Sequence, residues 1–551
     1  MPRTDALQDD GTTTAGGRTS TTDSGSTTRG DPQAPTSADG SSGGLDSTSS
    51  GGFIYDVMPE ATGTTGSRQA CHVVGELDAV GACEDVAPPG SFEPEVQWSW
   101  TGPDGDNYSI VTPLVANLTD DNGDGSIDLC DTPDIVVVVG TSGGSPFGFP
   151  GQIYVLDGAT GSEHFHIDAA SNVTTTPALG DLDGDGVVEI VTAAANGDIV
   201  AYDHEGTLLF SEPADWPYIG DGGTISGYYG AAIALADVDN DGDVEIIAGN
   251  FIADHEGQTV VTFDEPAGWW SATAAADLDG DGDLEIVLGH AAFHHDGTPA
   301  YVTDLQPGYP QIADLDADPE PEILLVNPLG ISLIDHDGTV QYQDENPTAV
   351  DAWPGGELDE RVLMRPATVH DFDGDGGPEY AVSSREFYSV YEPDGSLLWS
   401  VPVADLSGIA AGTAFDFLGD GVPEAMYADE SQLFVFDSGS GDVLLQSPRS
   451  SATLTEYPVV ADVDNDGSAE IVVTSNPFAG GGSPTVQVIR DAEDRWIQAR
   501  RIWNQHTYHV TNVREDGTIP THETPHWSLL NTYRTNAQID ASGVCDPPPQ
   551  G

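Results

Sequence analysis

Residues 181–189 read Asp-Leu-Asp-Gly-Asp-Gly-Val-Val-Glu, with acidic side chains at positions 1, 3, 5 and 9 of a nine-residue motif. The pattern occurs eight times, and the copies begin at Asp120, Asp181, Asp237, Asp277, Asp314, Asp371, Asp416 and Asp462. Successive copies start 37 to 61 residues apart. Repeats of roughly 40 to 50 residues are typical of the blades of a β-propeller, and insertions account for the longer intervals.

Strand-like residues flank these acidic loops. Residues 233–236 (Ile-Ala-Leu-Ala) precede the third loop, and residues 246–248 (Ile-Ile-Ala) follow it. A second theme recurs between loops at 202–206, 334–338 and 391–395, each ending in Gly after acidic or turn-forming residues, which predicts a hairpin between two outer strands. The sequence therefore predicts an all-β fold, a propeller of eight four-stranded blades, with seven blades as the alternative.

The spacing of the acids predicts calcium sites. Ca²⁺ takes six to eight oxygen ligands, and four carboxylates this close together would repel each other without a cation between them. Mg²⁺ fits less well, because it prefers to keep several waters. The expected ligands are Asp120, Asn122, Asp124 and Asp128; Asp181, Asp183, Asp185 and Glu189; Asp237, Asp239, Asp241 and Glu245; Asp277, Asp279, Asp281 and Glu285; Asp314, Asp316, Asp318 and Glu322; Asp371, Asp373, Asp375 and Glu379; Asp416, Asp420 and Glu424; and Asp462, Asp464, Asp466 and Glu470.

Two loops depart from the pattern. Pro319 replaces the usual glycine in the fifth loop, and Leu418 occupies position 3 of the seventh, where we expect a weak or empty site. An EF-hand would need an acid at position 12 and flanking helices. Only the first loop has such an acid, Asp131, so the EF-hand interpretation fails for the set.

With these loops, the sequence resembles the FG-GAP (or VCBS) repeat family of integrin α-subunit propellers and secreted bacterial proteins. The resemblance covers about residues 95–500. It implies a loop that joins two adjacent strands of each blade and binds calcium through the positions given above. It says little about the partner, because a fold does not determine a function.

The net charge and the cysteine content limit the possible classes of function further. The chain has 93 acidic residues against 14 basic ones, all arginine, and a net charge of −79. Such a protein cannot bind nucleic acid by neutralising phosphates, and divalent cations are its natural counter-charge; adaptation to high salt is a competing explanation for the charge.

Four cysteines without a CxxC motif predict two disulfides and an oxidising compartment. Of the three possible pairings, we expect Cys71–Cys83 with Cys130–Cys545.

Composition divides the chain into four parts. Residues 1–66 are rich in Ser, Thr and Gly and predict a disordered stalk; 67–94 form a small cysteine-bearing segment; 95–500 form the propeller; and 501–551 form an Arg-, His- and Trp-rich tail packed on it. No stretch is apolar enough to span a bilayer, and no signal peptide is visible. We nevertheless expect an extracellular or cell-surface protein.

The sequence favours a binding or adhesion module over an enzyme. We expect a monomer that recognises a protein or glycan through one propeller face, with no catalytic residues and no organic cofactor. The tail histidines His506, His509, His522 and His526 could converge on zinc, but a packed tail is the favoured interpretation. The alternative function is a secreted polysaccharide lyase, for which Arg361, Arg365 and Arg385 could line a cleft.

Overall fold

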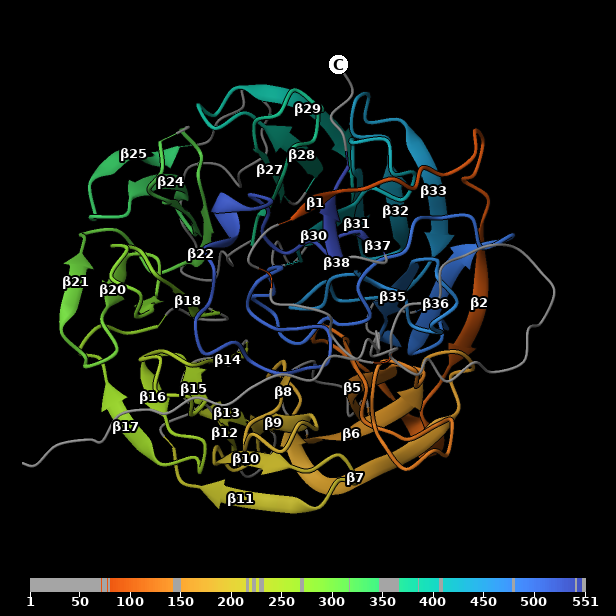
Figure 1. Ribbon diagram of the computed structural model, residues 1–551, viewed down its shortest axis with the longest axis horizontal. Helices are drawn as coiled ribbons and strands as arrows, with labels where there is room; N and C mark the ends of the chain where they lie inside the picture. Colours follow the sequence, from red (N-terminus) through yellow and green to blue (C-terminus); the bar gives the residue numbers. More distant parts are fainter. Residues whose placement is uncertain are drawn as a thin grey trace, which may run out of the picture. The chain divides into compact units, whose positions relative to one another are not determined.

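The computed structural model describes residues 71, 77 and 80–547, apart from 142–149, 215–217, 221–223, 227–231, 268–271, 317, 346–365, 385, 406–409, 478–480 and 541–542. The predicted stalk and the three arginines of the lyase alternative therefore lie outside the described residues. The chain divides into two units, Met1–Thr64 and Thr65–Gly551. The second unit is an eight-bladed β-propeller whose sheets form a closed ring (Figure 1).

Each acidic loop lies in its own sheet, so we number the blades 1 to 8 after their loops. The strands are as follows: blade 1, β4 (Leu114–Ala116), β5 (Asp134–Thr141), β6 (Pro150–Asp157) and β7 (Glu163–Asn172), with β3 (Asp106–Tyr108) also on β5; blade 2, β8 (Ala178–Gly180), β9 (Glu189–Ala193), β10 (Ile199–Tyr202) and β11 (Leu208–Glu212); blade 3, β14 (Ile233–Ala236), β15 (Glu245–Ala248), β16 (Phe251–Ala253) and β17 (Thr259–Thr262); blade 4, β18 (Ala274–Ala276), β19 (Glu285–Val287), β20 (Ala291–Phe293) and β21 (Pro299–Val302).

The remaining blades follow the same order: blade 5, β22 (Tyr309–Ala313), β23 (Glu322–Asn327), β24 (Gly330–Asp335) and β25 (Val340–Glu345); blade 6, β26 (Thr368–His370), β27 (Glu379–Ser383), β28 (Phe387–Tyr391) and β29 (Leu397–Pro402); blade 7, β30 (Gly412–Phe415), β31 (Glu424–Ala428), β32 (Gln432–Phe436) and β33 (Val443–Pro448); blade 8, β34 (Val459–Ala461), β35 (Glu470–Thr474), β36 (Val486–Asp491) and β2 (Pro94–Trp100). A small hairpin pairs β12 (Tyr218–Gly220) with β13 (Thr224–Ser226).

Burial rises from the rim of the ring to its centre. Every residue of β9 and β23 is buried, whereas the outermost strand β25 alternates between partly buried and exposed residues. The hydrophobic cores lie between neighbouring blades: one contains Ile199 of blade 2 with Ile246 of blade 3, and another contains Val390 of blade 6 with Phe436 of blade 7. One sheet buries its second face only when the next blade stacks on it, which is why the repeats close into a ring.

Strand β2 closes the ring. It precedes all other strands of the blades in sequence but pairs antiparallel with β36, so blade 8 combines both ends of the propeller (Figure 1). Trp98 secures this junction, because its indole N–H donates to the carbonyl of Gly158 in blade 1 at 2.7 Å. The hairpin turns predicted between outer strands are also confirmed: in blade 2 the Asp203 N–H donates to the Thr207 carbonyl between β10 and β11.

The expected cysteine pairing is wrong. The disulfides join Cys71 to Cys130 and Cys83 to Cys545. The second follows from a small sheet in which β1 (Gly81–Ala82) runs parallel to β38 (Gly543–Asp546), with β37 (Ile539–Asp540) on the other side, so that Cys83 lies beside Cys545. Sequence distance favoured a local bridge, but strand pairing decided the outcome.

The segment 497–540, which we call the central segment, contacts the innermost strands of seven blades. Its backbone or side chains hydrogen-bond to Val115, Leu179, Leu235, Ile312, Val369, Thr413 and Val460. It contains the 3₁₀ turn η3 (His526–Ser528); another, η1, spans Pro103–Gly105. In Figure 1 the blue C-terminal chain lies inside the ring. Across the described ranges, no helix is long and apolar enough to cross a membrane.

Candidate metal centres

Each of loops 2 to 8 leads from the innermost strand of its blade into the second strand. The position-9 glutamate is the first residue of that second strand, and one of its oxygens, Oε2, accepts a hydrogen bond from the backbone N–H of position 2. The seven pairs are Glu189–Leu182, Glu245–Val238, Glu285–Leu278, Glu322–Leu315, Glu379–Phe372, Glu424–Phe417 and Glu470–Val463, at 2.6 to 3.0 Å. The strand start therefore holds each glutamate over its own loop.

The position-1 aspartate organises the rest of the loop. In loop 2, Asp181 accepts from the N–H groups of Gly184 and Gly186, at 2.8 and 3.0 Å. Gly186 has φ of +87°, a conformation that only glycine adopts without strain, and position 6 has a positive φ in every loop that carries glycine there. The carboxylates at positions 3 and 5 of loops 2, 3, 4 and 6 are exposed at the protein surface.

The carboxylates of a loop converge. In loop 6, one oxygen from each of Asp371, Asp373, Asp375 and Glu379 lies within 4.8 Å of the others. Loop 8 is the most deeply buried of the set: Asp462 and Glu470 are fully buried, and within the described part of the chain Glu470 Oε1 has no hydrogen-bond partner. A buried carboxylate oxygen that has no such partner and lies near other carboxylates is one that a bound cation would satisfy.

Burial acts on the acidity of these groups. Loss of solvent, reinforced by neighbouring aspartates, raises the pKa of Glu189, Glu245 and Glu379 to about 8 and that of Glu285 and Glu322 to about 7. Without a cation, these carboxyls hold protons near neutral pH. A divalent ion would replace the protons and offset the repulsion between the acids.

Loop 1 is longer than its sequence pattern indicates. Its second strand, β5, begins at Asp134, whose Oδ2 accepts the Leu118 N–H at 2.9 Å, so Asp134 occupies the place that glutamate takes in the other blades. Asp128 lies inside the loop instead, and the buried Asp131 accepts from Asn122 and Asp128. The nine-residue pattern does not include Asp134, although an acid directly before Ile135 and a valine run matches Glu189 before Ile190.

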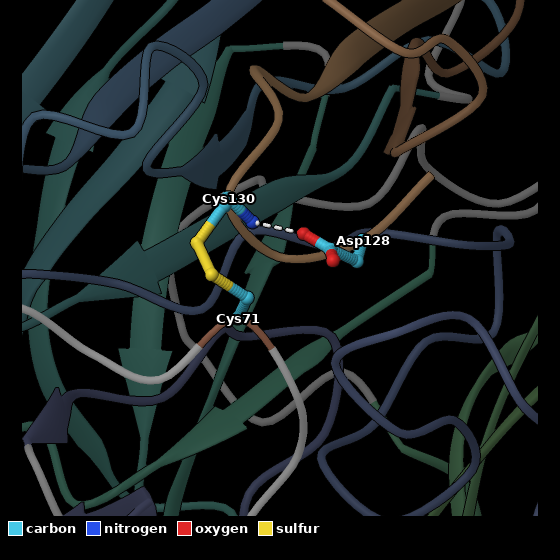
Figure 2. A group of neighbouring side chains, drawn as sticks. All are labelled: Cys71, Asp128 and Cys130. Carbon is cyan, nitrogen blue, oxygen red and sulfur yellow. Dashed lines mark hydrogen bonds between the residues drawn. A yellow bond between two sulfur atoms is a disulfide. The ribbon is translucent and has the colours of Figure 1, made fainter. Parts of the chain in front are cut away.

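Asp128 also lies beside a disulfide. Figure 2 shows its carboxylate accepting from the backbone N–H of Cys130, at 2.8 Å, while Cys130 is bonded to Cys71. Both sulfurs are therefore bonded to each other and are not thiolate ligands.

Loop 7 contacts other parts of the chain. The Leu418 carbonyl accepts from Ala87 N–H at 2.8 Å, and the Phe417 carbonyl accepts from Ile497 N–H at 3.0 Å. Burial raises the pKa of Asp416 to about 6. In loop 5, Pro319 has no N–H that could donate to the carboxylate of Asp314 at position 1. The backbone N–H of Asp314 donates to Asn531 Oδ1 of the central segment at 2.9 Å.

Histidines face the strand-start acids in two blades. In blade 4, His294 Nδ1 lies 2.8 Å from Glu285 Oε1, and in blade 1, His164 Nε2 lies 3.3 Å from Asp134 Oδ1. The turn at His294 matches the turn at Asp335, because the backbone N–H of His294 donates to the Thr298 carbonyl and that of Asp335 donates to the Thr339 carbonyl. The contact of His294 with a loop carboxylate was not anticipated.

The four tail histidines separate into three locations. His506 is buried and stacks on Tyr309, and His522 Nδ1 lies 2.6 Å from Asn240 Oδ1 in loop 3. His509 and His526 come together with Glu523, and one donor atom of each of the three lies within 4.8 Å of the others. The sequence analysis weighed a histidine metal site, favoured a packed tail, and did not indicate Glu523.

Comparison with known proteins supports the repeat and the fold. A family model described as FG-GAP-like repeat matches residues 181–248, which span loops 2 and 3. The structure resembles the Vibrio cholerae biofilm matrix protein Bap1, with a TM-score of 0.68 and 22% identity over 84% of this chain and 100% of that one. A rhamnogalacturonan lyase from Bacillus licheniformis is less similar, with a TM-score of 0.47 and 18% identity over 81% of this chain and 80% of that one. No curated protein matches the sequence. The chain thus carries FG-GAP-like repeats in a propeller.

Proposed function

We propose that this protein is a calcium-stabilised extracellular binding module that recognises a protein or glycan through its propeller. The observation that carries the calcium part is loop 8, where the buried Glu470 Oε1 has no hydrogen-bond partner among the described residues. Asp462, Asp464 and Asp466 of the same loop lie close enough to repel its charge. A hard cation with many oxygen ligands suits this donor set.

The ligands of the proposed ions come from the loops as the structure arranges them. Loops 2 to 6 and 8 contribute acids at positions 1, 3, 5 and 9, and loop 1 contributes Asp120, Asn122 and Asp124 with Asp131 as a further oxygen donor. Bound Ca²⁺ supplies positive charge and coordination at points where the innermost and second strands of a blade are joined. The ion therefore stiffens each blade and removes the repulsion between its carboxylates.

The surface of the propeller suits a binding role. The central segment occupies the middle of the ring, and its Arg500, Arg534 and Trp503 are buried there. A partner would therefore meet the outer faces and not a central channel. The exposed acids at positions 3 and 5 would hold ions where hydroxyl or carboxylate oxygens of a glycan or protein can reach them.

Two disulfides fit a location outside the cytosol, since such bonds persist in oxidising compartments. The net charge of −79 argues against nucleic acids and against polyanions that bind without a bridging cation. We propose that the protein works as a monomer.

The calcium part is tested by elemental analysis and thermal unfolding of the whole chain. We expect several Ca²⁺ per chain after dialysis, and a lower melting temperature in EDTA. At a free Ca²⁺ concentration of 100 times the Kd of a site, that site stabilises the fold by about 2.7 kcal/mol, because the ion binds only the native state. An absence of tightly bound Ca²⁺ together with an unchanged melting temperature would contradict the proposal.

The binding part needs a separate assay. Immobilised protein is exposed to panels of neutral glycans, acidic glycans and extracellular proteins, with Ca²⁺ and with EDTA. Binding that disappears in EDTA supports the proposal. The same samples are mixed with uronic-acid polymers, and the appearance of unsaturated sugar products would assign the lyase alternative instead.

A further inference from the structure

We propose that His509, Glu523 and His526 form a binding site for one transition-metal ion, with Zn²⁺ as the expected ion. The site lies in the central segment and is separate from the eight acidic loops. His509 and His526 are 3% and 0% exposed, and their rings lie 4.4 Å apart between centroids. The three donor atoms belong to residues spread over 18 positions of sequence, yet they converge within 4.8 Å.

Backbone carbonyls orient both imidazoles. His509 Nδ1 lies 3.0 Å from the Thr507 carbonyl oxygen, and His526 Nε2 lies 2.8 Å from the Ile312 carbonyl oxygen of β22. A carbonyl oxygen only accepts, so each of these ring nitrogens must carry the proton. The nitrogens left over, Nε2 of His509 and Nδ1 of His526, therefore present lone pairs when the rings are neutral. Metal-bound histidines in proteins are held in this way by an acceptor on the far nitrogen.

Within the described residues, neither lone pair faces an N–H or hydroxyl donor. His509 Nε2 lies 2.6 Å from Glu523 Oε1, which places an acceptor opposite an acceptor unless a cation stands between them or one of the two groups carries a proton there. His526 Nδ1 is fully buried and has no hydrogen-bond partner among the residues that the structure describes. A proton on His509 would account for the first contact only. One metal ion would account for both.

The donor set selects the class of metal. Two imidazoles and one carboxylate suit Zn²⁺ and its neighbours in the first transition row, whereas Ca²⁺ and Mg²⁺ prefer oxygen alone. Zn²⁺ binds nitrogen and oxygen at about 2.0–2.2 Å, so tetrahedral ligands are about 3.3 Å apart. Glu523 and His509 must therefore separate by somewhat less than 1 Å from their present 2.6 Å when the ion enters.

The ion would join two parts of the central segment to each other and would strengthen the attachment of this segment to the ring. His526 lies at the start of η3 and is hydrogen-bonded to β22, and His509 stacks on Tyr533, whose N–H donates to Val369 of β26. A bond from the metal to both histidines joins these contacts into one unit. The Thr511 hydroxyl donates at 3.0 Å to Glu523 Oε1, the oxygen that faces His509, and so orients the third ligand.

Co²⁺ is the probe, because tetrahedral Co²⁺ with nitrogen ligands gives intense visible bands that six-coordinate Co²⁺ in oxygen loops lacks. The whole chain without an affinity tag is first stripped of metal with a chelator, saturated with excess Ca²⁺ and then titrated with Co²⁺. We expect bands that saturate at one equivalent and disappear when Zn²⁺ is added. Glu523→Gln and His526→Gln should abolish the bands.

His522→Gln is the matched control, since His522 lies in the same segment but contacts Asn240 outside the cluster. Its cobalt spectrum should equal that of the unmodified protein. If a ligand variant fails to fold, the zinc content of the unmodified protein by native mass spectrometry decides instead, with one Zn²⁺ per chain expected. Absence of tetrahedral bands and of bound Zn²⁺, or bands that survive both ligand substitutions, would overturn the proposal and leave a simple His509–Glu523 ion pair.

Discussion

Removal of each disulfide should have a different cost, because the two bonds close loops of very different length. Cys83 and Cys545 are 462 residues apart, and Cys71 and Cys130 are 59 apart. In the chain-entropy model the longer loop contributes about 6 kcal/mol to the free energy of unfolding and the shorter one about 4 kcal/mol, both as upper values. Unfolding a unit of this size has an entropy of about 1 kcal/mol per degree, so we expect melting temperatures lower by about 6 °C and about 4 °C.

The measurement is differential scanning calorimetry at a fixed scan rate, in excess Ca²⁺ and without reductant. The double variants Cys83→Ser with Cys545→Ser and Cys71→Ser with Cys130→Ser are compared, and each serves as the control for the other. Peptide mapping first checks that the remaining bond is the native one. If the pair at 71 and 130 proves the more stabilising, or if neither removal shifts the transition, then the loop-length reasoning is refuted.

Three further predictions concern the acidic loops. Glu470→Gln should lower the melting temperature in Ca²⁺ by several degrees, whereas the exposed Glu320→Gln should leave it unchanged, as thermal unfolding would show. Burial raises the pKa of Glu245 and Glu379 to about 8, above the unfolded value of about 4.3, so folding favours their protonated form. The metal-free protein should therefore lose stability as the pH rises from about 5 to about 8. Melting curves recorded with and without Ca²⁺ across this range should show that Ca²⁺ removes the loss. Leu418→Asp supplies the missing position-3 oxygen of loop 7 and should add one Ca²⁺ by elemental analysis; an unchanged calcium count would contradict this account of the loop.

Local patterns predicted the blades well. Each acidic loop connects the first two strands of its own sheet, because the aspartates and, in most loops, a glycine favour a turn, and the apolar residues after the strand-start acid favour a strand. The same nine-residue pattern predicted that Asp128 starts the second strand of blade 1, but in the structure that strand begins at Asp134. A nine-residue template could not accommodate an insertion within the loop itself.

Long-range pairing lay beyond the sequence pattern. Nothing in residues 94–100 indicates that they complete a sheet with residues 486–491, because the residues of an edge strand do not specify which other strand it will pair with. The cysteine pairing failed for the same reason, because β1 and β38 bring Cys83 to Cys545. Likewise, histidine spacing alone could not select His509 and His526 from four candidates or add Glu523 to them.

The composition of blade 8 also has a consequence for biosynthesis. On the ribosome, β2 is made almost 360 residues before β34, so the nascent chain holds a strand without neighbours while blades 1 to 7 emerge. Until β36 is translated, both end faces of the growing stack remain bare, and β2 is free to join a wrong sheet edge. A chain stopped before residue 459 would keep this exposure permanently. The ring can therefore close only after translation has passed β36, because β2 has no partner before that point.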